Sequence, residues 1–323
     1  MNIELLNLLR ETYCRDEFPA IQPFVDHFRN TFGDGLQTIV LYGSRLDPSL
    51  ATDTSFYDFY LVVDDVRTVF HRRRDRWLAS FLPPNIYYLE LPGEGGQKLN
   101  CKYCVIDLDT LRDEVGPLAR DLYHLGRFSK RLAVVWSRDS FDRDETLSVC
   151  LKAMETLTPH AINRVGNTFI LDELIRRALA LSYEGEVRLE KIEEKVDALF
   201  NSAADFYRQA WSILLKQYRQ NHRDLFHEAG EHDEPGLIYL RRSPSRRASM
   251  HRETADLIAR SRRRAKLRWP KGMLLVDNWV DILLAKIERT YGVKIELSER
   301  ERRWILIFGW KYFFRLRREG KIN

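Results

Sequence analysis

The sequence contains few cysteines and no long hydrophobic run. Its 323 residues include four cysteines, too few at this length for the disulfide framework of a secreted protein. Cys101 and Cys104 form a CxxC pair with no second Cys or His pair nearby, so we expect buried thiols and no metal site there. No stretch reaches the ~18 apolar residues that a membrane-spanning helix requires.

The first residues also lack the features of a targeting segment. The segment MNIELLNLLRETYCRDE has early acidic residues and no basic n-region, so we expect no signal peptide. Neither an internal repeat nor a low-complexity tract is present. These features favour a cytoplasmic protein with reduced thiols.

The residues that are present are typical of a globular protein of about two domains. Hydrophobic residues make up 44% of the chain and aromatic residues 12%, which is enough to bury a core in each domain. The net charge is only +5, too small for a uniformly basic surface, so we expect no nucleic-acid partner. No feature of the sequence indicates an obligate protein partner.

The stretch from Thr38 to Asp65 carries the chemistry on which the functional prediction depends. A β-rich run over 38–42 stops at Gly43-Ser44, and a second run over 56–63 carries Asp58 in its middle. A carboxylate inside an apolar strand is costly unless it is paired, and a Gly-Ser turn offers backbone N–H groups to a phosphate. The combination favours a corner for a metal ion and a triphosphate; the alternative is a strand pair with Asp58 at a solvated edge.

The pattern around this stretch predicts a small α+β domain over residues 1–142. Further β-rich runs lie at 86–91, 102–107 and 132–136, and apolar residues at helical spacing cover 66–81, between the second and third strands. We expect a mixed, mainly antiparallel sheet with helices packed beside it.

A second domain, over residues 143–298, is predicted where the pattern changes from strands to helices. One of its helices is expected to begin at Thr158-Pro159. Residues 229–272 are rich in arginine and predict a basic loop. We expect this loop to be solvated, and contact with anionic lipid is the alternative.

Residues 299–323 form an amphipathic tail. The segment ERERRWILIFGWKYFFRLRR, which begins at Glu299, combines aromatic residues with arginines. It is too short and too interrupted to span a bilayer, but aromatic side chains enter the headgroup region where arginines meet anionic lipid. We therefore expect peripheral binding to the inner face of a membrane; the alternative is a terminal helix packed on the second domain.

Several short motifs occur in an order that resembles one enzyme family. They are Gly43-Ser44-Arg45, Asp58 within DFYLVVDD, His71, Tyr87-Tyr88, Lys102-Tyr103, GRFSK at 126–130 and LSYEGEVR at 181–188. Over roughly residues 38–215 this order resembles the mitochondrial-type phosphatidate cytidylyltransferases, the soluble CDP-diacylglycerol synthases of the translocator-assembly-and-maintenance family, which has bacterial members. A Gly-Ser pair with one acid is shared by nucleotidyltransferases in general, so the resemblance depends on the ordered set.

The resemblance implies a nucleotidyltransferase-like domain joined to a helical domain. It also implies a Mg²⁺-dependent reaction of CTP with phosphatidic acid, which yields CDP-diacylglycerol and pyrophosphate at a membrane surface. The positions that match are Gly43, Ser44, Asp58, Lys102, Arg127, Lys130, Tyr183 and Arg188. Arg45 departs from the mitochondrial members, which tend to have a small residue there, and a bulky cation would change how the triphosphate lies in the loop.

The chemistry of the reaction divides these residues by role. Nucleotidyl transfer holds the acceptor oxygen, the α-phosphorus and the leaving pyrophosphate in line and neutralises phosphate charge. We assign catalytic roles to Asp58 and Lys102. The expected nucleotide- and phosphate-binding residues are Gly43, Ser44, Arg45, Arg127, Lys130, Tyr183 and Arg188. For each cation alone, an ordinary surface ion pair is the alternative.

The expected Mg²⁺ site lacks one carboxylate. Many nucleotidyltransferases place two acids one residue apart on a strand, so that both lie on one face, but the second position here is Tyr60. We expect Asp58 and Glu90, from a neighbouring strand, to hold the metal; otherwise it relies on triphosphate oxygens and water. Asp64 and Asp65 are expected to cap the following helix.

Two other classes of function stay open at this stage. A nucleotidyltransferase of the same fold could use RNA or a small molecule as its acceptor. The missing second acid is also compatible with an inactive module that binds nucleotide or lipid. Product formation with lipid, with RNA or with neither distinguishes the three.

Overall fold

The computed structural model describes most of the chain. The described residues are 2–14, 18–47, 49–51, 55–69, 85–93, 98–186, 192–227, 236–275, 280–281, 284, 287–288 and 292–318. They belong to two compact units, Met1–Trp269 and Pro270–Asn323. The helix predicted over 66–81 is described only in its first turn, α3 (Val66–Val69), and its remainder lies outside the described residues.

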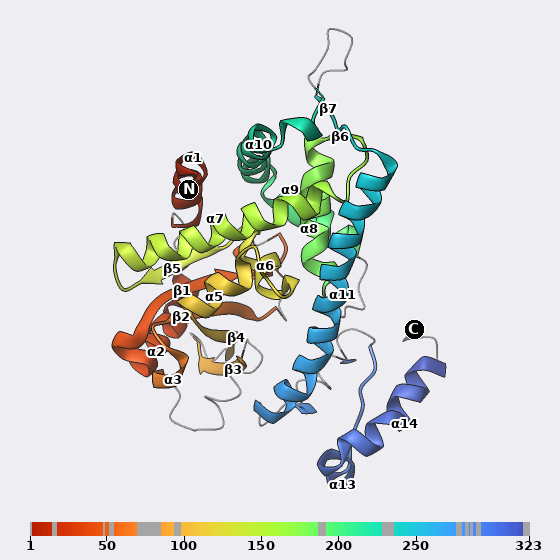
Figure 1. The fold of residues 1–323 in the computed structure, drawn as a ribbon. Helices are drawn as coiled ribbons and strands as arrows, with labels where there is room; N and C mark the ends of the chain where they lie inside the picture. The colour runs from red at the N-terminus through yellow and green to blue at the C-terminus, as the bar shows by residue number, and fades with distance from the viewer. Residues whose placement is uncertain are drawn as a thin grey trace. The chain divides into compact units, whose positions relative to one another are not determined.

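A five-stranded mixed sheet organises the first unit (Figure 1). Its strands are β1 (Leu36–Tyr42), β2 (Tyr57–Val63), β3 (Asn85–Pro92), β4 (Lys98–Asp107) and β5 (Ala133–Ser137). The order across the sheet is β3-β4-β2-β1-β5. The pair β2–β4 is parallel and the other three pairs are antiparallel, which confirms the predicted α+β class with a mixed sheet.

Side chains alternate along the central strands, so each face of the sheet buries its own hydrophobic cluster. Leu41 and Cys101 belong to the cluster on the face packed by α2 (Gln22–Phe32). Val40 and Cys104 belong to the cluster on the opposite face. Both thiols of the CxxC pair are therefore buried, as expected, and they point to opposite sides of the sheet.

The opposite face packs against helices from both predicted domains. These helices are α1 (Ile3–Tyr13), α5 (Leu108–Val115), α6 (Leu122–Phe128), α7 (Ser140–Ile162), α8 (Leu171–Glu184), α9 (Ile192–Ser202) and α10 (Ala204–Asn221). All seven contribute to one hydrophobic cluster with strand residues of the sheet. The predicted boundary at 142/143 falls in the first turn of α7. A short antiparallel pair, β6 (Thr168–Ile170) with β7 (Leu237–Tyr239), lies outside the main sheet.

The predicted helix start at Thr158-Pro159 is wrong. The helix α7 begins at Ser140, where the Asp139 side chain accepts a hydrogen bond from the backbone N–H of Asp142, and Pro159 lies in its last turn. Buried residues continue on α7 from Leu147 to Ile162, so packing maintains the helix through a residue pair that usually begins one.

The basic loop predicted over 229–272 is also wrong for most of its length, because residues 244–275 form the long helix α11 (Pro244–Leu275). Arginine, lysine and alanine are good helix formers, and their density outweighs the loop signal. Thr254, Leu257, Ile258 and Ser261 are buried, which gives α11 one narrow apolar and small-residue face at helical spacing.

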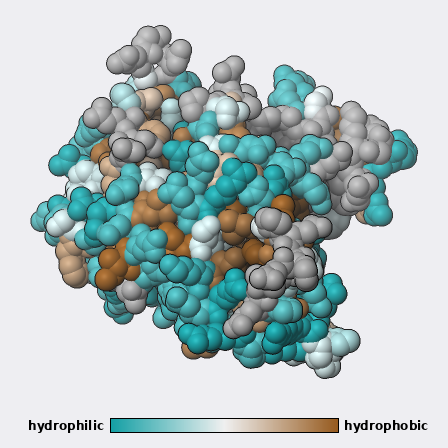
Figure 2. Space-filling model, turned by 90° about the horizontal axis from the view of Figure 1, so that it is seen from above, coloured by the Kyte–Doolittle hydropathy of each residue, from teal (hydrophilic) through white to brown (hydrophobic). Residues whose placement is uncertain are grey.

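The second unit contains α13 (Glu299–Arg303) and α14 (Ile305–Arg318). Ser298 and Glu301 form a capping box at the start of α13. No helix in the described part of the chain is long and apolar enough to cross a membrane. On the face of the molecule in Figure 2, hydrophilic residues predominate and hydrophobic ones gather near the middle.

Gly126 lies where α6 crosses α8 at short range. A Cβ at this position would stand 2.7 Å from both the Cα and the Cβ of Ser182, and real Cβ atoms do not approach backbone so closely. The absence of a side chain at Gly126 therefore sets the distance between the two helices, and with it the position of the neighbouring Arg127.

We expect Gly126→Ala to lower the free energy of unfolding by ~1–3 kcal/mol, because α6 must move away from α8. Denaturant titration measures the change. Gly35→Ala is the control, since a Cβ there would meet only the Val69 Cγ1 atom, at 3.4 Å. If Gly126→Ala were as stable as Gly35→Ala, the close helix contact would be contradicted.

Candidate active site

Four side chains form a row across the sheet where β1 ends and β2 begins. Asp58 pairs with Tyr42 of antiparallel β1 and with Lys102 of parallel β4, and Lys102 pairs with Tyr88 of β3. Residues that pair in register lie on the same face, here the face covered by α5 to α8. The structure therefore places the two predicted catalytic residues, Asp58 and Lys102, side by side.

Gly43 brings backbone close to the carboxylate of Asp58. Its φ of +87° lies in the left-handed region, and a Cβ on it would stand 2.9 Å from Asp58 Oδ2. Ser44 follows as the first residue of a 3₁₀ turn over Ser44–Leu46. Glycine is thus required at position 43 by its backbone angle and by the space that it leaves beside the carboxylate.

Arg45 has local partners that explain the bulky cation after Gly-Ser. Its Nε donates a hydrogen bond of 3.0 Å to the carbonyl oxygen of Ser55, and its guanidinium lies 5.0 Å from the centre of the Tyr57 ring. Both contacts join the two ends of the β1–β2 loop. Arg45 therefore has a structural role in the loop next to its predicted role in phosphate binding.

Aromatic rings surround the ammonium group of Lys102. Its Nζ lies 4.8 Å from the ring centre of Phe56 and 5.8 Å from that of Tyr88. These cation–π contacts attract the ammonium group, and they restrict a flexible side chain to the face that carries Asp58.

Arg127 approaches the row from α6 and is paired with a carboxylate. Its Nη1 lies 2.8 Å from Glu186 Oε1, and the two side chains are only 15% and 17% exposed. The guanidinium also stacks 3.6 Å from the ring centre of Tyr123 and lies 6.0 Å from that of Tyr42. Burial lowers the pKa of Arg127. The nearby Glu186 carboxylate and Tyr123 raise it by more than burial lowers it, so the pKa of Arg127 lies well above its ordinary value.

Lys130 and Tyr183, two of the predicted phosphate-binding residues, lie next to each other. The Lys130 Nζ lies 4.4 Å from the ring centre of Tyr183, and the Lys130 carbonyl accepts a 3.0 Å hydrogen bond from the hydroxyl of Tyr13. Helices α6 and α8, which pack through Gly126, bring this pair together. Arg188, the last predicted phosphate ligand, lies outside the described residues.

The structure does not bring Glu90 to Asp58. Glu90 is exposed, its carboxylate lies 2.7 Å from Lys98 Nζ, and it pairs in register with Asn100, two residues before Lys102 on β4. Two strand spacings, about 10 Å, separate it from β2. Tyr60, at the usual second-acid position, is buried with its hydroxyl 3.1 Å from His124 Nδ1. Among the described residues, no group of three His, Cys, Asp or Glu side chains could hold a metal ion.

One carboxylate is nevertheless a workable holder for Mg²⁺ in a nucleotide site. Mg²⁺ is commonly bound through one or two carboxylates plus substrate phosphates. The absence of a Cβ at Gly43 leaves room beside Asp58 Oδ2, because a Cβ there would stand 2.9 Å from this oxygen. These residues fit a Mg²⁺ ion held by Asp58 and a triphosphate, and they do not fit the predicted Asp58–Glu90 pair.

Asp64 and Asp65 are separate from this site. Asp64 accepts hydrogen bonds from Arg138, which lower its pKa. Asp65 accepts a 2.7 Å hydrogen bond from the backbone N–H of Arg67 at the start of α3. The capping role is therefore seen for Asp65, whereas Asp64 connects β2 to the start of α7 through Arg138.

The phenols beside Asp58 remain protonated at neutral pH. Burial, and then the negative charge of Asp58, raise the pKa of Tyr42 well above its ordinary value. The same two causes raise the pKa of Tyr88. Neither phenol can therefore serve as a general base at neutral pH, and both can act as hydrogen-bond donors.

The sequence did not indicate three features of this site. Glu186 is part of a quoted motif, but nothing in the motif indicates its pairing with Arg127. Phe56 and Tyr88 have no spacing that predicts contact with Lys102. The buried acid Asp121 caps α6 and binds Arg268 of α11 at 2.7 Å, and only the position of α11 in the fold brings this pair together.

Comparisons with known proteins find little similarity. No protein-family model matches the sequence, and no match to a curated protein is found. Among solved structures, the chain is similar to a nucleotidyltransferase-like protein from Exiguobacterium sibiricum 255-15, with 10% identity and a TM-score of 0.26 over 74% of this chain and 88% of that one. Likeness at this level says nothing of the activity or the substrate, which the site geometry must indicate.

We expect Gly43→Ala to weaken nucleotide binding, an effect that backbone strain at this position does not explain by itself. The added Cβ displaces the Asp58 carboxylate, so binding of Mg²⁺ with a nucleoside triphosphate should weaken by about tenfold or more, measured by calorimetry. Gly236→Ala is a matched control, because Gly236 has a φ of +86° and nothing within 4 Å of an added Cβ. It should lose ~1 kcal/mol of stability and retain nucleotide binding; equal loss in both variants would contradict the role of Gly43.

Proposed function

We propose that this protein is a cytidylyltransferase that converts CTP and phosphatidic acid to CDP-diacylglycerol and pyrophosphate. The observation that carries the proposal is the row in which Asp58 lies next to Lys102 and beneath the Gly43-Ser44 turn. The ordered motifs of the sequence support the choice of CTP and of a lipid acceptor. The arrangement of Gly43, Ser44, Asp58 and Lys102, called the corner below, supports nucleotidyl transfer in general.

In the proposed reaction a phosphate oxygen of the acceptor attacks the α-phosphorus of CTP. The bond from the α-phosphorus to the bridging oxygen breaks, and pyrophosphate leaves with the electron pair. Since the acceptor phosphate is already ionised near neutral pH, no residue needs to remove a proton from it. This agrees with a site whose phenols are held protonated and where geometry and charge are the main requirements.

Each residue of the site has a separate role in the proposed reaction. The Gly43-Ser44 turn offers backbone N–H groups to triphosphate oxygens, and Asp58 would hold Mg²⁺, which neutralises phosphate charge when bound. Lys102, directed by Phe56 and Tyr88, supplies a positive charge beside Asp58. Arg127 and Lys130, on the side of α6, supply charge for a second phosphate group.

The tail supports a site of action at a membrane surface. Trp310 and Phe314 are each 59% exposed on α14, their ring centres are 6.0 Å apart, and Arg315, Arg317 and Arg318 follow in the same helix. Exposed aromatic side chains next to arginines favour the headgroup region of anionic membranes. We therefore propose that the protein acts in the cytoplasm, bound peripherally to the inner face of a membrane through this helix.

Replacing Asp58 tests the assignment of the corner. Transfer of labelled CMP from CTP to phosphatidate-containing liposomes should require Mg²⁺. It should fall by at least about 10²-fold in Asp58→Asn, with the thermal transition little changed. Asp47→Asn in the same loop is the control, since the Asp47 carboxylate accepts hydrogen bonds only from nearby Ser49 among the described residues.

The outcomes of this assay distinguish the alternatives. Retained activity in Asp58→Asn would mean that the corner is not the catalytic site. Product with RNA or a small molecule but none with phosphatidate would favour another acceptor. Nucleotide or liposome binding without product from any acceptor would favour an inactive binding module.

The tail is tested separately with Trp310→Ala/Phe314→Ala. Sedimentation with vesicles that contain phosphatidate should fall by about tenfold or more, because full burial of each aromatic side chain is worth ~2 kcal/mol. Ile3→Ala/Phe141→Ala, which removes side chains that are 68% and 69% exposed in the first unit, should sediment as the wild type does. Deletion of residues 300–323 should match the tail variant; unchanged sedimentation would indicate a packed terminal helix.

A further inference from the structure

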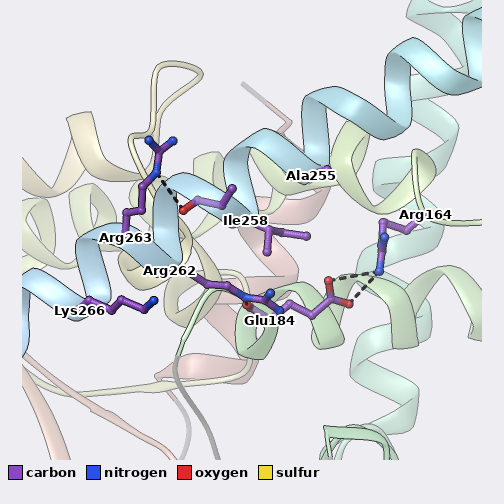
Figure 3. A pocket seen from close by; sticks show the side chains of 8 residues that line it. Arg164, Glu184, Ala255, Ile258, Arg262, Arg263 and Lys266 are labelled. Atoms are coloured by element: carbon purple, nitrogen blue, oxygen red, sulfur yellow. Dashed lines mark hydrogen bonds and ion pairs between the residues drawn. The ribbon is translucent and has the colours of Figure 1, made fainter.

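A concave basic surface lies away from the row at Asp58, between α11 and the ends of α7 and α8. The cavity measures about 490 Å³, and its charged residues are Arg164, Glu184, Arg262, Arg263 and Lys266. Figure 3 shows that Arg164 and Arg262 reach Glu184 from opposite sides, that Lys266 extends toward Arg262, and that Arg263 points away along the helix. The side chains of Ala255, Ile258 and Ala259 provide its apolar part.

The lining carries an excess of positive charge. Arg164, Arg262 and Lys266 together with Glu184 give the side chains that face the cavity a formal charge of +2, from +3 and −1. Both oxygens of Glu184 lie 3.2 Å from the Nη2 atom of Arg164. Glu184 therefore neutralises the charge of Arg164, which follows the end of α7. The cations of α11 are therefore not balanced by the carboxylate that lines the cavity.

The geometry of the cations suits a compact anion with several oxygens. The Arg262 Nε donates a 2.8 Å hydrogen bond to the backbone carbonyl of Glu184, which holds the guanidinium at the cavity wall, and the remaining N–H groups of an arginine fork can serve a phosphate. Lys266, one helical turn further on, adds a mobile point charge. A singly charged carboxylate would balance only half of this charge of +2, whereas a phosphate with two charges matches it.

The cavity is separate from the site at Asp58 but connected to it by consecutive residues. The backbone carbonyl of Gly185 accepts a 3.0 Å hydrogen bond from Ser261 of α11, and the next residue, Glu186, pairs with Arg127. A Cβ on Gly185 would stand 2.5 Å from Ser261 Oγ, so α11 lies directly on this segment. Glu184 and Glu186, which flank Gly185, thus face different sites. Glu184 lines the cavity and Glu186 pairs with Arg127.

We propose that this cavity is a second anion site, which binds a phosphate group carrying at least two negative charges. Arg262 and Lys266 contact the phosphate oxygens, Arg164 lies behind them with Glu184, and the apolar residues of α11 pack against the remainder of the ligand. A free polyphosphate and the headgroup of an anionic lipid share this chemistry. The proposal does not depend on the reaction at Asp58.

Calorimetric titration with inorganic pyrophosphate, and in parallel with monomeric short-chain phosphatidate, tests the site. The pocket variant is Arg262→Gln/Lys266→Gln, and the matched control is Arg252→Gln/Arg260→Gln, which removes two exposed charges from the same helix outside the cavity. We expect the pocket variant to lose one class of binding, or to weaken it at least tenfold, and the control to change less than twofold. The ligand that shows this difference identifies the source of the phosphate.

Two results would overturn the proposal. Equal weakening in both variants would mean that the net charge of α11 acts at long range. Abolition of all phosphate binding by Lys102→Met would mean that the site at Asp58 is the only one. If the double pocket variant does not fold, Lys266→Gln alone, at an exposed position, should still weaken binding about threefold or more, and unchanged binding in that variant would also overturn the site.

Discussion

The pairing of β2 with a neighbour on each side determines where the candidate site lies. Antiparallel β1 brings Tyr42 to Asp58, and parallel β4 brings Lys102 to its other side. A slip of one residue would turn Asp58 to the face packed by α2, because side chains alternate along a strand. The register is maintained by buried residues on both faces, such as Leu61 and Val62, so hydrophobic packing positions a polar site.

The helices add the second group of charges through close contacts between small residues. Gly126 against Ser182 brings α6 onto α8, and Ser261 against Gly185 brings α11 onto the end of α8. Buried Asp121 completes this arrangement, since it caps α6 and pairs with Arg264 and Arg268 of α11. An acid buried without such partners would be costly, so α6 and α11 depend on each other.

Much of the fold could be predicted from local patterns. Strand alternation around Gly43 and Asp58 correctly indicated β1, β2 and the α+β class, and the ordered motifs named residues that the structure brings together at Asp58–Lys102 and at Lys130–Tyr183. The errors share a cause, which is that tertiary packing overrides local preference. Buried residues on α7 maintain the helix through Thr158-Pro159, where the sequence predicted a helix start. Buried residues on α11 likewise accompany a continuous helix where the sequence predicted an arginine-rich loop. The wrong metal pairing arose because sequence order gives neither strand order nor register, and Glu90 lies two strands from β2.

The ion pair between Arg127 and Glu186 changes how ligand affinity should be read at this site. A phosphate that bound Arg127 through its Nη1 atom would have to replace a carboxylate that is already there at 2.8 Å, so recognition at that atom would be an exchange of one anion for another. The gain in free energy is then the difference between two ion pairs and the hydration of the released carboxylate. Because Glu186 takes the place of small counterions around Arg127, this contact adds less to the salt dependence of binding than an arginine in open solvent would. Under the proposed function, the site would therefore select a ligand by how much better than a carboxylate its oxygens fit the guanidinium.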